Sequence, residues 1–153
     1  MKKHILRIDT REQKPLFFDT FGVKVRREKL SCGDYHMVFS DGTSSSVVFE
    51  RKSIPDLFGT MTKGHERFKK EMTRAKEQGL SMVILVEGPL SQVAKGCKHS
   101  RVPGITIIRT VFSLWTRYGL VPIFSRNREE ASQYILQFYL AEYRKQQKEV
   151  GNG

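Results

Sequence analysis

Alternating hydrophobic and polar positions mark several strands in the first third of this chain. Residues 4–9 alternate and end on Asp9, which predicts a first strand. Three more runs are rich in β-branched and aromatic side chains and are separated by short polar turns, which predicts strands at 23–30, 34–39 and 47–52. Asp41-Gly42 lies between the last two runs and favours a hairpin that pairs them antiparallel.

The rest of the chain alternates between helical and strand patterns. The apolar segment 16–21 predicts a short helix, and Ser53 with Asp56 has the spacing of a helix start. That helix is expected to be interrupted near Gly64 and to end at about Gln78. Apolar residues then predict a buried strand at 82–86, a helix at 105–119, a second buried strand at 121–124 and a long last helix at 129–149. This order predicts an α/β fold with a mixed central sheet and helices on both faces.

Length and composition indicate one globular domain. The chain has 153 residues, of which 39% are hydrophobic and 28% are charged, as in ordinary globular proteins. We expect a single domain over residues 1–150 and a disordered tail at 151–153. Cys32 and Cys97 lack the spacing of a zinc site. No apolar run approaches the about 18 residues of a membrane span, so we expect no membrane partner and a cytoplasmic location, or a nuclear one in a eukaryote.

The charge balance points to a polyanionic partner. Lys and Arg number 27 against 16 Asp and Glu, which gives a formal net charge of +11, and nucleic acid is the first candidate. The helix after residue 53 is strongly basic, and its predicted DNA contacts are Lys63, Arg67, Lys70 and Arg74. The alternative is a solvated helix face, because Glu66, Glu71 and Glu77 interrupt the basic residues.

Charged side chains at the ends of the predicted strands suggest a metal site. Glu50 and Lys52 lie two residues apart in one strand, so they point the same way, about 6.6 Å apart, while Arg51 points to the other face. Asp34 begins the neighbouring strand and can reach the same place through the hairpin. Two converging carboxylates repel each other unless a divalent cation binds. Their hard oxygen ligands favour Mg²⁺, with Mn²⁺ as a substitute.

The same residues could hydrolyse a phosphodiester. Asp9-Thr10-Arg11-Glu12 follows the first strand near the same sheet edge, and Asp9 could be a third metal ligand beside Asp34 and Glu50. Lys52 could orient the attacking water, and Arg11 or Arg51 could orient phosphate and carboxylates. Asp56 could act in catalysis or only at the helix start. The predicted catalytic set is Asp9, Arg11, Glu12, Asp34, Glu50, Arg51, Lys52 and Asp56.

These motifs resemble a known nuclease family. Residues 8–12 (IDTRE), 33–35 (GDY) and 50–56 (ERKSIPD) are similar to the motifs of the XPF/Mus81/Hef (ERCC4-type) nucleases, whose signature is GD, a variable gap, ERK, three residues and D. Residues 82–88 and 121–135 resemble the second half of the archaeal Hef nuclease domain. The resemblance covers about residues 3–148. It implies a restriction-endonuclease-like (PD-(D/E)XK-type) core, Mg²⁺-dependent cleavage of DNA near branch points, and a homodimer.

The chain also differs from the usual architecture of that family. Members usually carry a tandem helix-hairpin-helix domain after the nuclease domain, and some carry a helicase domain before it. Neither is expected here, so the resemblance implies a stand-alone nuclease domain that could rely on an accessory DNA-recognition protein. The apolar stripe over 105–115 and the cluster Tyr134, Ile135, Phe138 and Tyr139 offer a dimer surface. Two alternatives stay open: a non-catalytic DNA-binding subunit of a nuclease heterodimer, or a nuclease acting on unbranched DNA or RNA.

Overall fold

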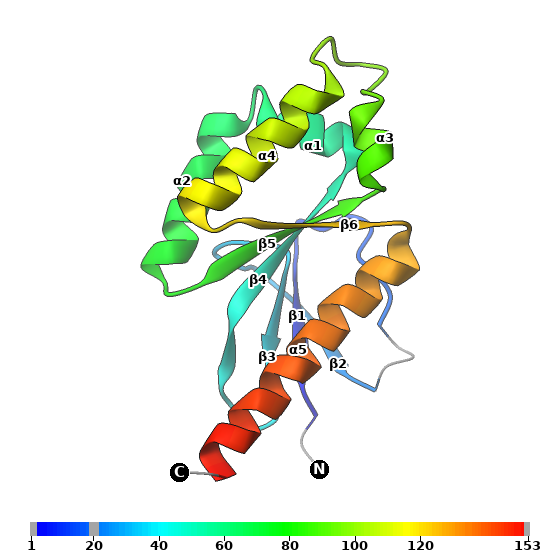
Figure 1. Ribbon diagram of the computed structural model, residues 1–153. Coiled ribbons are helices and arrows are strands. Elements are labelled where there is room, and N and C mark those ends of the chain that lie inside the picture. The colour runs from blue at the N-terminus through cyan, green and yellow to red at the C-terminus, as the bar shows by residue number, and fades with distance from the viewer. Residues whose placement is uncertain (1–2, 19–21, 152–153) are drawn as a thin grey trace.

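A six-stranded mixed sheet forms the centre of the protein (Figure 1). The computed structural model describes residues 3–18 and 22–151. The strands are β1 (Ile5–Asp9), β2 (Lys24–Glu28), β3 (Tyr35–Val38), β4 (Ser44–Ser53), β5 (Ser81–Glu87) and β6 (Val121–Ser125). Their spatial order is β2-β1-β3-β4-β5-β6. β3 is antiparallel to both of its neighbours, whereas β1 is parallel to β2, and β4, β5 and β6 are parallel to one another.

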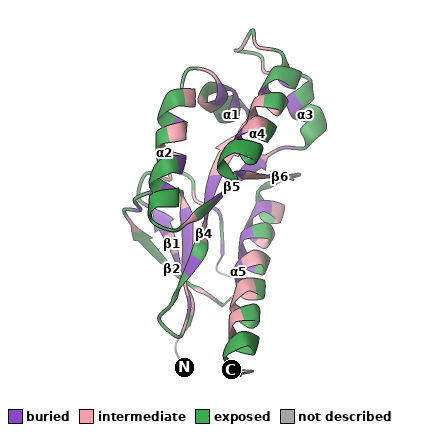
Figure 2. Ribbon diagram, turned by 60° about the vertical axis from the view of Figure 1, so that its left-hand side comes forward, coloured by how far each residue is buried: buried purple, intermediate pink, exposed green. Residues whose placement is uncertain are grey.

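Helices cover both faces of this sheet, as the sequence predicts. One face is covered by α5 (Arg128–Gly151), whereas the other carries α1 (Ile54–Met61), α2 (His65–Glu77), α3 (Leu90–Ala94) and α4 (Gly104–Tyr118) (Figure 1). β5 is apolar along most of its length because both of its faces are buried (Figure 2). Ile84 packs in the core under α1, α2 and α4, while Val83 and Leu85 pack in the core under α5. No helix within the described ranges is long and apolar enough to cross a membrane.

Three local predictions differ from the structure. Residues 16–18 are not helical. Leu16 and Phe18 are nevertheless buried, and the Leu16 N–H donates to the Tyr35 hydroxyl, so burial of an irregular segment explains the apolar pattern; residues 19–21 lie outside the described ranges. The short helix α3 was not predicted. A disordered tail is predicted from residue 151, but Gly151 is the last residue of α5. Residues 152–153 lie outside the described part.

Candidate active site

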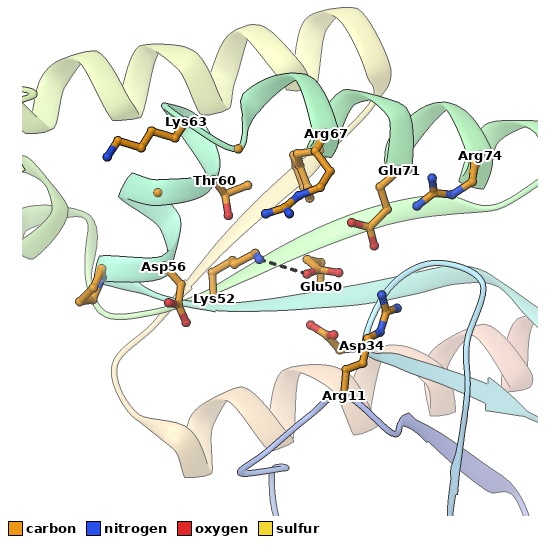
Figure 3. Close-up of a pocket in the computed structure, with 14 residues that line it drawn as sticks. Arg11, Asp34, Glu50, Lys52, Asp56, Thr60, Lys63, Arg67, Glu71 and Arg74 are labelled. Carbon is orange, nitrogen blue, oxygen red and sulfur yellow. Dashed lines mark ion pairs between the residues drawn. The ribbon is translucent and has the colours of Figure 1, made fainter.

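A polar cleft of about 820 Å³ opens between β4 and the helix pair α1–α2. β3 and β4 bring Asp34, Glu50 and Lys52 to its floor, and α1 and α2 form the opposite wall (Figure 3). The other polar side chains that line it are Arg11, Asp56, Thr60, Lys63, Arg67, Glu71 and Arg74. Five of the eight predicted catalytic residues, including Arg11, therefore meet the predicted basic helix in one place.

The turn before β3 fixes the position of Asp34. Gly33 has a φ of +73°, and a Cβ at this position would lie 2.9 Å from Cβ of Val48, so only glycine fits. The Asp34 N–H then donates to the Phe49 carbonyl over 2.7 Å, and the Arg51 N–H donates to Asp34 Oδ2 over 2.8 Å. The Gly-Asp pair thus places a carboxylate beside the strand that carries Glu50.

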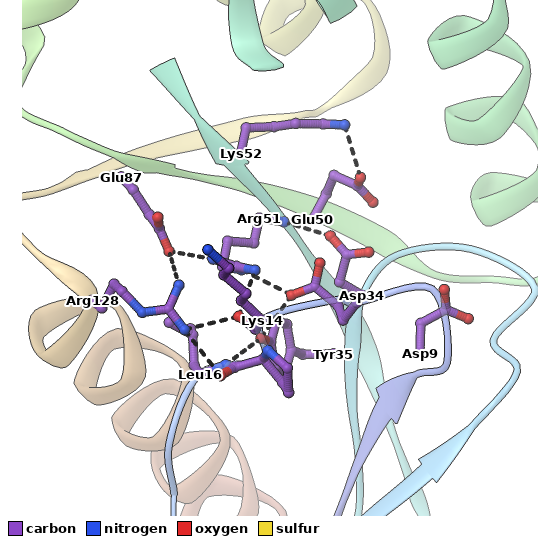
Figure 4. Close-up of polar contacts among 12 residues, drawn as sticks. Asp9, Lys14, Leu16, Asp34, Tyr35, Glu50, Arg51, Lys52, Glu87 and Arg128 are labelled. Atoms are coloured by element: carbon purple, nitrogen blue, oxygen red, sulfur yellow. Dashed lines mark hydrogen bonds and ion pairs between the residues drawn. The ribbon is translucent and has the colours of Figure 1, made fainter. Parts of the chain in front are cut away.

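The alternation of β4 places the other two groups as predicted. Glu50 is only 6% exposed, and Lys52 Nζ lies 3.3 Å from Glu50 Oε1. Figure 3 shows both side chains entering the cleft from the same strand. Their intervening neighbour, Arg51, leaves the strand on the other side (Figure 4).

Burial and mutual repulsion disfavour the charged forms of the two carboxylates. Burial and, after it, the negative charge of Glu12 raise the pKa of Asp34 to about 7, against the hydrogen bond from the Arg51 N–H. The pKa of Glu50 also lies well above its usual value because the group is buried and faces Asp34 and Glu71. The cleft therefore concentrates negative charge that a bound cation would neutralise.

The donor atoms fit a hard divalent cation. Within the described residues, no hydrogen bond occupies Asp34 Oδ1 or Glu50 Oε2, so each carboxylate keeps an oxygen for a ligand. Mg²⁺ is commonly held by one or two carboxylates together with water and substrate phosphate oxygens. A complete protein cage is not present: no three His, Cys, Asp or Glu side chains in the described ranges are grouped closely enough to hold a metal.

Asp9, the third predicted metal ligand, does not line the cleft with this pair. Its buried Oδ1 accepts the Leu30 N–H over 2.8 Å, and its Oδ2 accepts Arg11 Nε over 2.6 Å. Burial alone would raise the pKa of Asp9, but the hydrogen bonds from Leu30 and Arg11 hold it below its usual value. Asp9 is absent from the cleft lining, and it acts on the site by orienting Arg11.

Arg51 and Glu12, two more residues of the predicted catalytic set, do not line the cleft either. Arg51 Nε lies 2.8 Å from Glu12 Oε2, its Nη1 lies 2.6 Å from Glu87 Oε1, and its Nη2 donates to the Lys14 carbonyl (Figure 4). Burial would lower the pKa of Arg51, but the pairs with Glu87 and Glu12 hold it above its usual value. The network fastens the segment after Arg11 to the sheet, with help from Arg128, which donates to the Lys14 carbonyl.

Asp56 lies in the first turn of α1, where it could act in catalysis or only at the helix start. The Asp56 N–H donates to Ser53 Oγ over 3.2 Å, with Pro55 in the first turn, which is an ordinary helix N-cap. The side chain of Asp56 nevertheless lines the cleft beside Lys52 (Figure 3). Both interpretations of this residue therefore remain compatible with its position.

The face of α2 toward the cleft differs from the predicted set in two residues. Lys63, just before the helix, and Arg67 and Arg74 line the cleft, but Lys70 is exposed outside it. Glu71, which sequence reasoning treated as an interruption of the basic pattern, lies in the cleft, and its Oε1 accepts the Gly33 N–H over 3.1 Å. Its spacing of four from Arg67 and three from Arg74 was the available signal, because such residues share one helix face.

Comparisons with known proteins agree with this arrangement. The sequence model of the ERCC4 domain matches residues 8–138. XPF from Aeropyrum pernix in complex with DNA has a similar structure, with a TM-score of 0.71 and 22% identity over 92% of this chain and 65% of that one. XPF from Aeropyrum pernix without DNA gives a TM-score of 0.67 and 24% identity over 86% of this chain and 57% of that one.

Two further facts define the reach of these comparisons. The chain spans about two thirds or less of the length of the structures that it matches. A search of curated proteins by sequence finds no match. The matched fold, together with the six-stranded mixed sheet, confirms the predicted restriction-endonuclease-like architecture.

Proposed function

Since the chain belongs to the ERCC4 domain family, we propose that it is a DNA endonuclease that hydrolyses phosphodiester bonds with the aid of Mg²⁺ or Mn²⁺. The observation that carries this proposal is the convergence of Asp34, Glu50 and Lys52 in one basic-walled cleft. Two buried carboxylates with raised pKa values are costly to a fold, and such groups cluster at functional sites. The filled motif positions favour an enzyme over a non-catalytic subunit.

Asp34 and Glu50 would hold the metal through the oxygens that accept no hydrogen bond from any described residue. A bound Mg²⁺ or Mn²⁺ would supply positive charge for a non-bridging phosphate oxygen and would make a coordinated water more acidic. Asp9 takes no part in this proposal, because its oxygens are engaged by Leu30 and Arg11.

The remaining polar groups of the cleft would position the substrate. Lys52 lies 3.3 Å from Glu50 and can donate a hydrogen bond to the attacking water or to phosphate. Arg11 is 67% exposed despite its bond to Asp9, so its guanidinium can also meet a phosphate. Arg67 from α2 faces the same space from the opposite wall (Figure 3).

The proposed substrate is branched DNA, such as a flap or a fork. Support comes from the family and from the solved relative, XPF from Aeropyrum pernix, which is in complex with DNA. The basic residues of α2 that line the cleft would contact backbone phosphates on either side of the cut. An accessory DNA-recognition protein stays part of the proposal.

We also propose that the protein forms a homodimer. The flank of α4 away from α2 exposes large apolar side chains: Trp115 is 43% exposed and Phe112 39% exposed, and their rings stack. Ile105 continues this surface, and Tyr134 of α5 is also exposed. Isolated exposed apolar residues are ordinary, but a stripe along one helix is typical of an interface.

Cleavage assays test the nuclease directly. Labelled flap, fork, linear duplex and RNA substrates are incubated with Mg²⁺, Mn²⁺ or EDTA, using wild type, Asp34→Asn, Lys52→Ala and the exposed control Glu77→Gln. We expect metal-dependent cutting of the branched substrates that is lost in the first two variants and kept in the control. DNA binding without cutting by the wild type would instead indicate the non-catalytic subunit, and equal cutting of linear DNA or RNA would overturn the branched substrate.

A further inference from the structure

A second basic groove lies on the far side of α2 from the cleft. It has a volume of about 330 Å³ and runs between α2 and α4. Its cationic side chains are Lys69 from α2 and Arg109 and Arg117 from α4. His65, at the start of α2, also lines it. None of the side chains that line it is acidic. Among the described residues, the only ion pair at its edge joins Lys69 to Glu66, which is 82% exposed and lies outside the lining.

Several polar side chains of this groove lack an ion-pair or hydrogen-bond partner among the described residues. In the part of the chain that the structure describes, Arg109 and Arg117 form no ion pair, and Nδ1 of His65 is buried without a hydrogen bond. Thr106 and Ser113 also line the groove, and their hydroxyls have no hydrogen-bond partner among the described residues. A groove that gathers three cationic side chains and has no acidic side chain in its lining is suited to an anion.

The two sides of α4 show that this groove is separate from the apolar stripe. Ile107, Val111 and Leu114 face the core. Phe112 and Trp115 lie on one flank, and Arg109, Ser113 and Arg117 lie on the other. One helix thus presents an apolar surface to one side and a cationic surface to α2.

We propose that the α2–α4 groove is a second phosphate-binding site, which holds the sugar-phosphate backbone of the DNA whose cut strand lies in the cleft. This inference rests on the proposed nuclease function. α2 separates the two sites, with Arg67 facing the cleft and Lys69 facing the groove. An α-helix is about 10–12 Å across with its side chains, and the major groove of B-DNA is about 12 Å wide. α2 therefore has the width to lie between two backbones.

The test compares two double charge reversals that alter net charge equally. Arg109→Glu with Arg117→Glu removes the groove cations, whereas Arg144→Glu with Lys148→Glu changes exposed cations on α5, across the sheet. Affinity for a linear duplex and for a fork is measured over a range of salt concentrations. Each lost phosphate contact lowers the slope of log K against log salt by about 0.9, so we expect the groove variant to lose about 1–2 units of slope and about tenfold or more in affinity.

Several outcomes would overturn the proposal. If wild type binds DNA and the two reversals weaken binding equally, or the salt slope is unchanged, the groove is not a phosphate site and the nuclease proposal stands. If wild type neither binds nor cuts DNA, both proposals fail. Arg109→Gln with Arg117→Gln, a milder change, is run in parallel with circular dichroism, and it must show the same loss of slope in a folded protein.

Discussion

The backbone N–H of Arg51 donates to Asp34 Oδ2 over 2.8 Å. The strand that carries Glu50 and Lys52 therefore also holds the carboxylate of the neighbouring strand. The guanidinium of Arg51, on the opposite side of β4, is meanwhile bound by Glu12 and Glu87. Arg51 thus links Asp34, a proposed metal ligand, to the ion-pair network that holds the segment after Arg11 against the sheet. The two sides of Arg51 can be tested separately.

Asp34→Asn should stabilise the metal-free protein at neutral and alkaline pH. The pKa of Asp34 is about 7 in the fold and about 3.9 in an unfolded chain. The folded state thus binds more protons between these values, and stability falls as pH rises through that window. Asparagine keeps the acceptor for the Arg51 N–H but carries no charge. Thermal melts in EDTA should show the variant melting higher than wild type at pH 8 and similarly near pH 4.

The size of this effect is readily measured. In a domain of about 150 residues, 1 kcal/mol of stability shifts the melting temperature by about 2–4 °C. Glu77→Gln, an exposed change on α2, serves as the control and should show no pH-dependent gain. A difference between Asp34→Asn and wild type that stayed constant from pH 4 to pH 8 would contradict the raised pKa.

Mn²⁺ or Mg²⁺ should raise the melting temperature of wild type through Asp34 and Glu50. A ligand that binds only the folded state stabilises it by about 2.7 kcal/mol at 100 times its dissociation constant. The increment should vanish in Asp34→Asn and in Glu50→Gln. Asp9→Asn tests whether Asp9 is also a metal ligand, because without that role it should melt lower in EDTA yet keep the metal increment. Loss of that increment in Asp9→Asn would restore Asp9 as a ligand.

Glu71→Gln should lower the pKa of Asp34. Burial is the main cause of the raised pKa, and the negative charge of Glu71 adds to it. Glutamine can still accept the Gly33 N–H, so the turn should keep its shape while the charge is removed. Carboxyl ¹³C shifts of Asp34, followed against pH in EDTA, should show a midpoint at lower pH in Glu71→Gln and an unchanged one in Glu77→Gln. A midpoint shared by all three proteins would show that Glu71 is electrostatically remote.

Arg51→Ala should destabilise the fold, whereas Arg67→Ala should not. The side chain of Arg51 is 12% exposed, and its removal leaves Glu12 and Glu87 without their main partner; loss of one member of a buried pair costs about 3–5 kcal/mol. Arg67 is exposed and lines the cleft, so its removal should change stability by less than about 0.5 kcal/mol and weaken DNA binding. Denaturant unfolding and binding assays measure both, and equal stability of the two variants would refute the structural role of Arg51.

Local pattern was enough to predict the centre of the site. Period-two alternation places Glu50 and Lys52 together and Arg51 opposite, and the Asp41-Gly42 hairpin brings the strand of Asp34 alongside; the structure shows all of this. These relations depend on neighbours in sequence or on one tight turn. The same reasoning placed the six strands and the longer helices, because each of these elements carries its own hydrophobic period, but it missed the short α3.

The parts that sequence reasoning missed depend on how distant segments dock. Asp9 and Glu12 are close to Arg11 in sequence, yet their side chains do not enter the cleft. Glu12 binds Arg51 and Tyr35, and Asp9 accepts the Leu30 N–H. Glu71 meets Gly33 only because α2 packs across the sheet. Residues 16–18 look helical by composition, but their burial requires no helix. Tertiary contacts of this kind leave no local period in the chain.

The proposed homodimer can be tested on the apolar flank of α4. Phe112→Glu and Trp115→Glu place a charge within the stacked aromatic pair, and burying an unpaired charge in an interface is costly. Thr106→Glu adds the same charge on the opposite flank of the helix, at the second groove. Sedimentation velocity at micromolar concentration should show a dimer for wild type and Thr106→Glu, and monomers for the two aromatic variants.

The same experiment separates the dimer from the chemistry. The cleft is lined by residues of α1, α2, the sheet and the Arg11 loop, with none from α4, so a dissociated variant should keep its metal-dependent melting increment even if its cleavage of branched DNA falls. A wild-type monomer at micromolar concentration would overturn the dimer and leave the cleft unaffected. A dimer that survives both aromatic substitutions would move the interface away from α4, for which Tyr134 on α5 offers the next substitution, Tyr134→Glu.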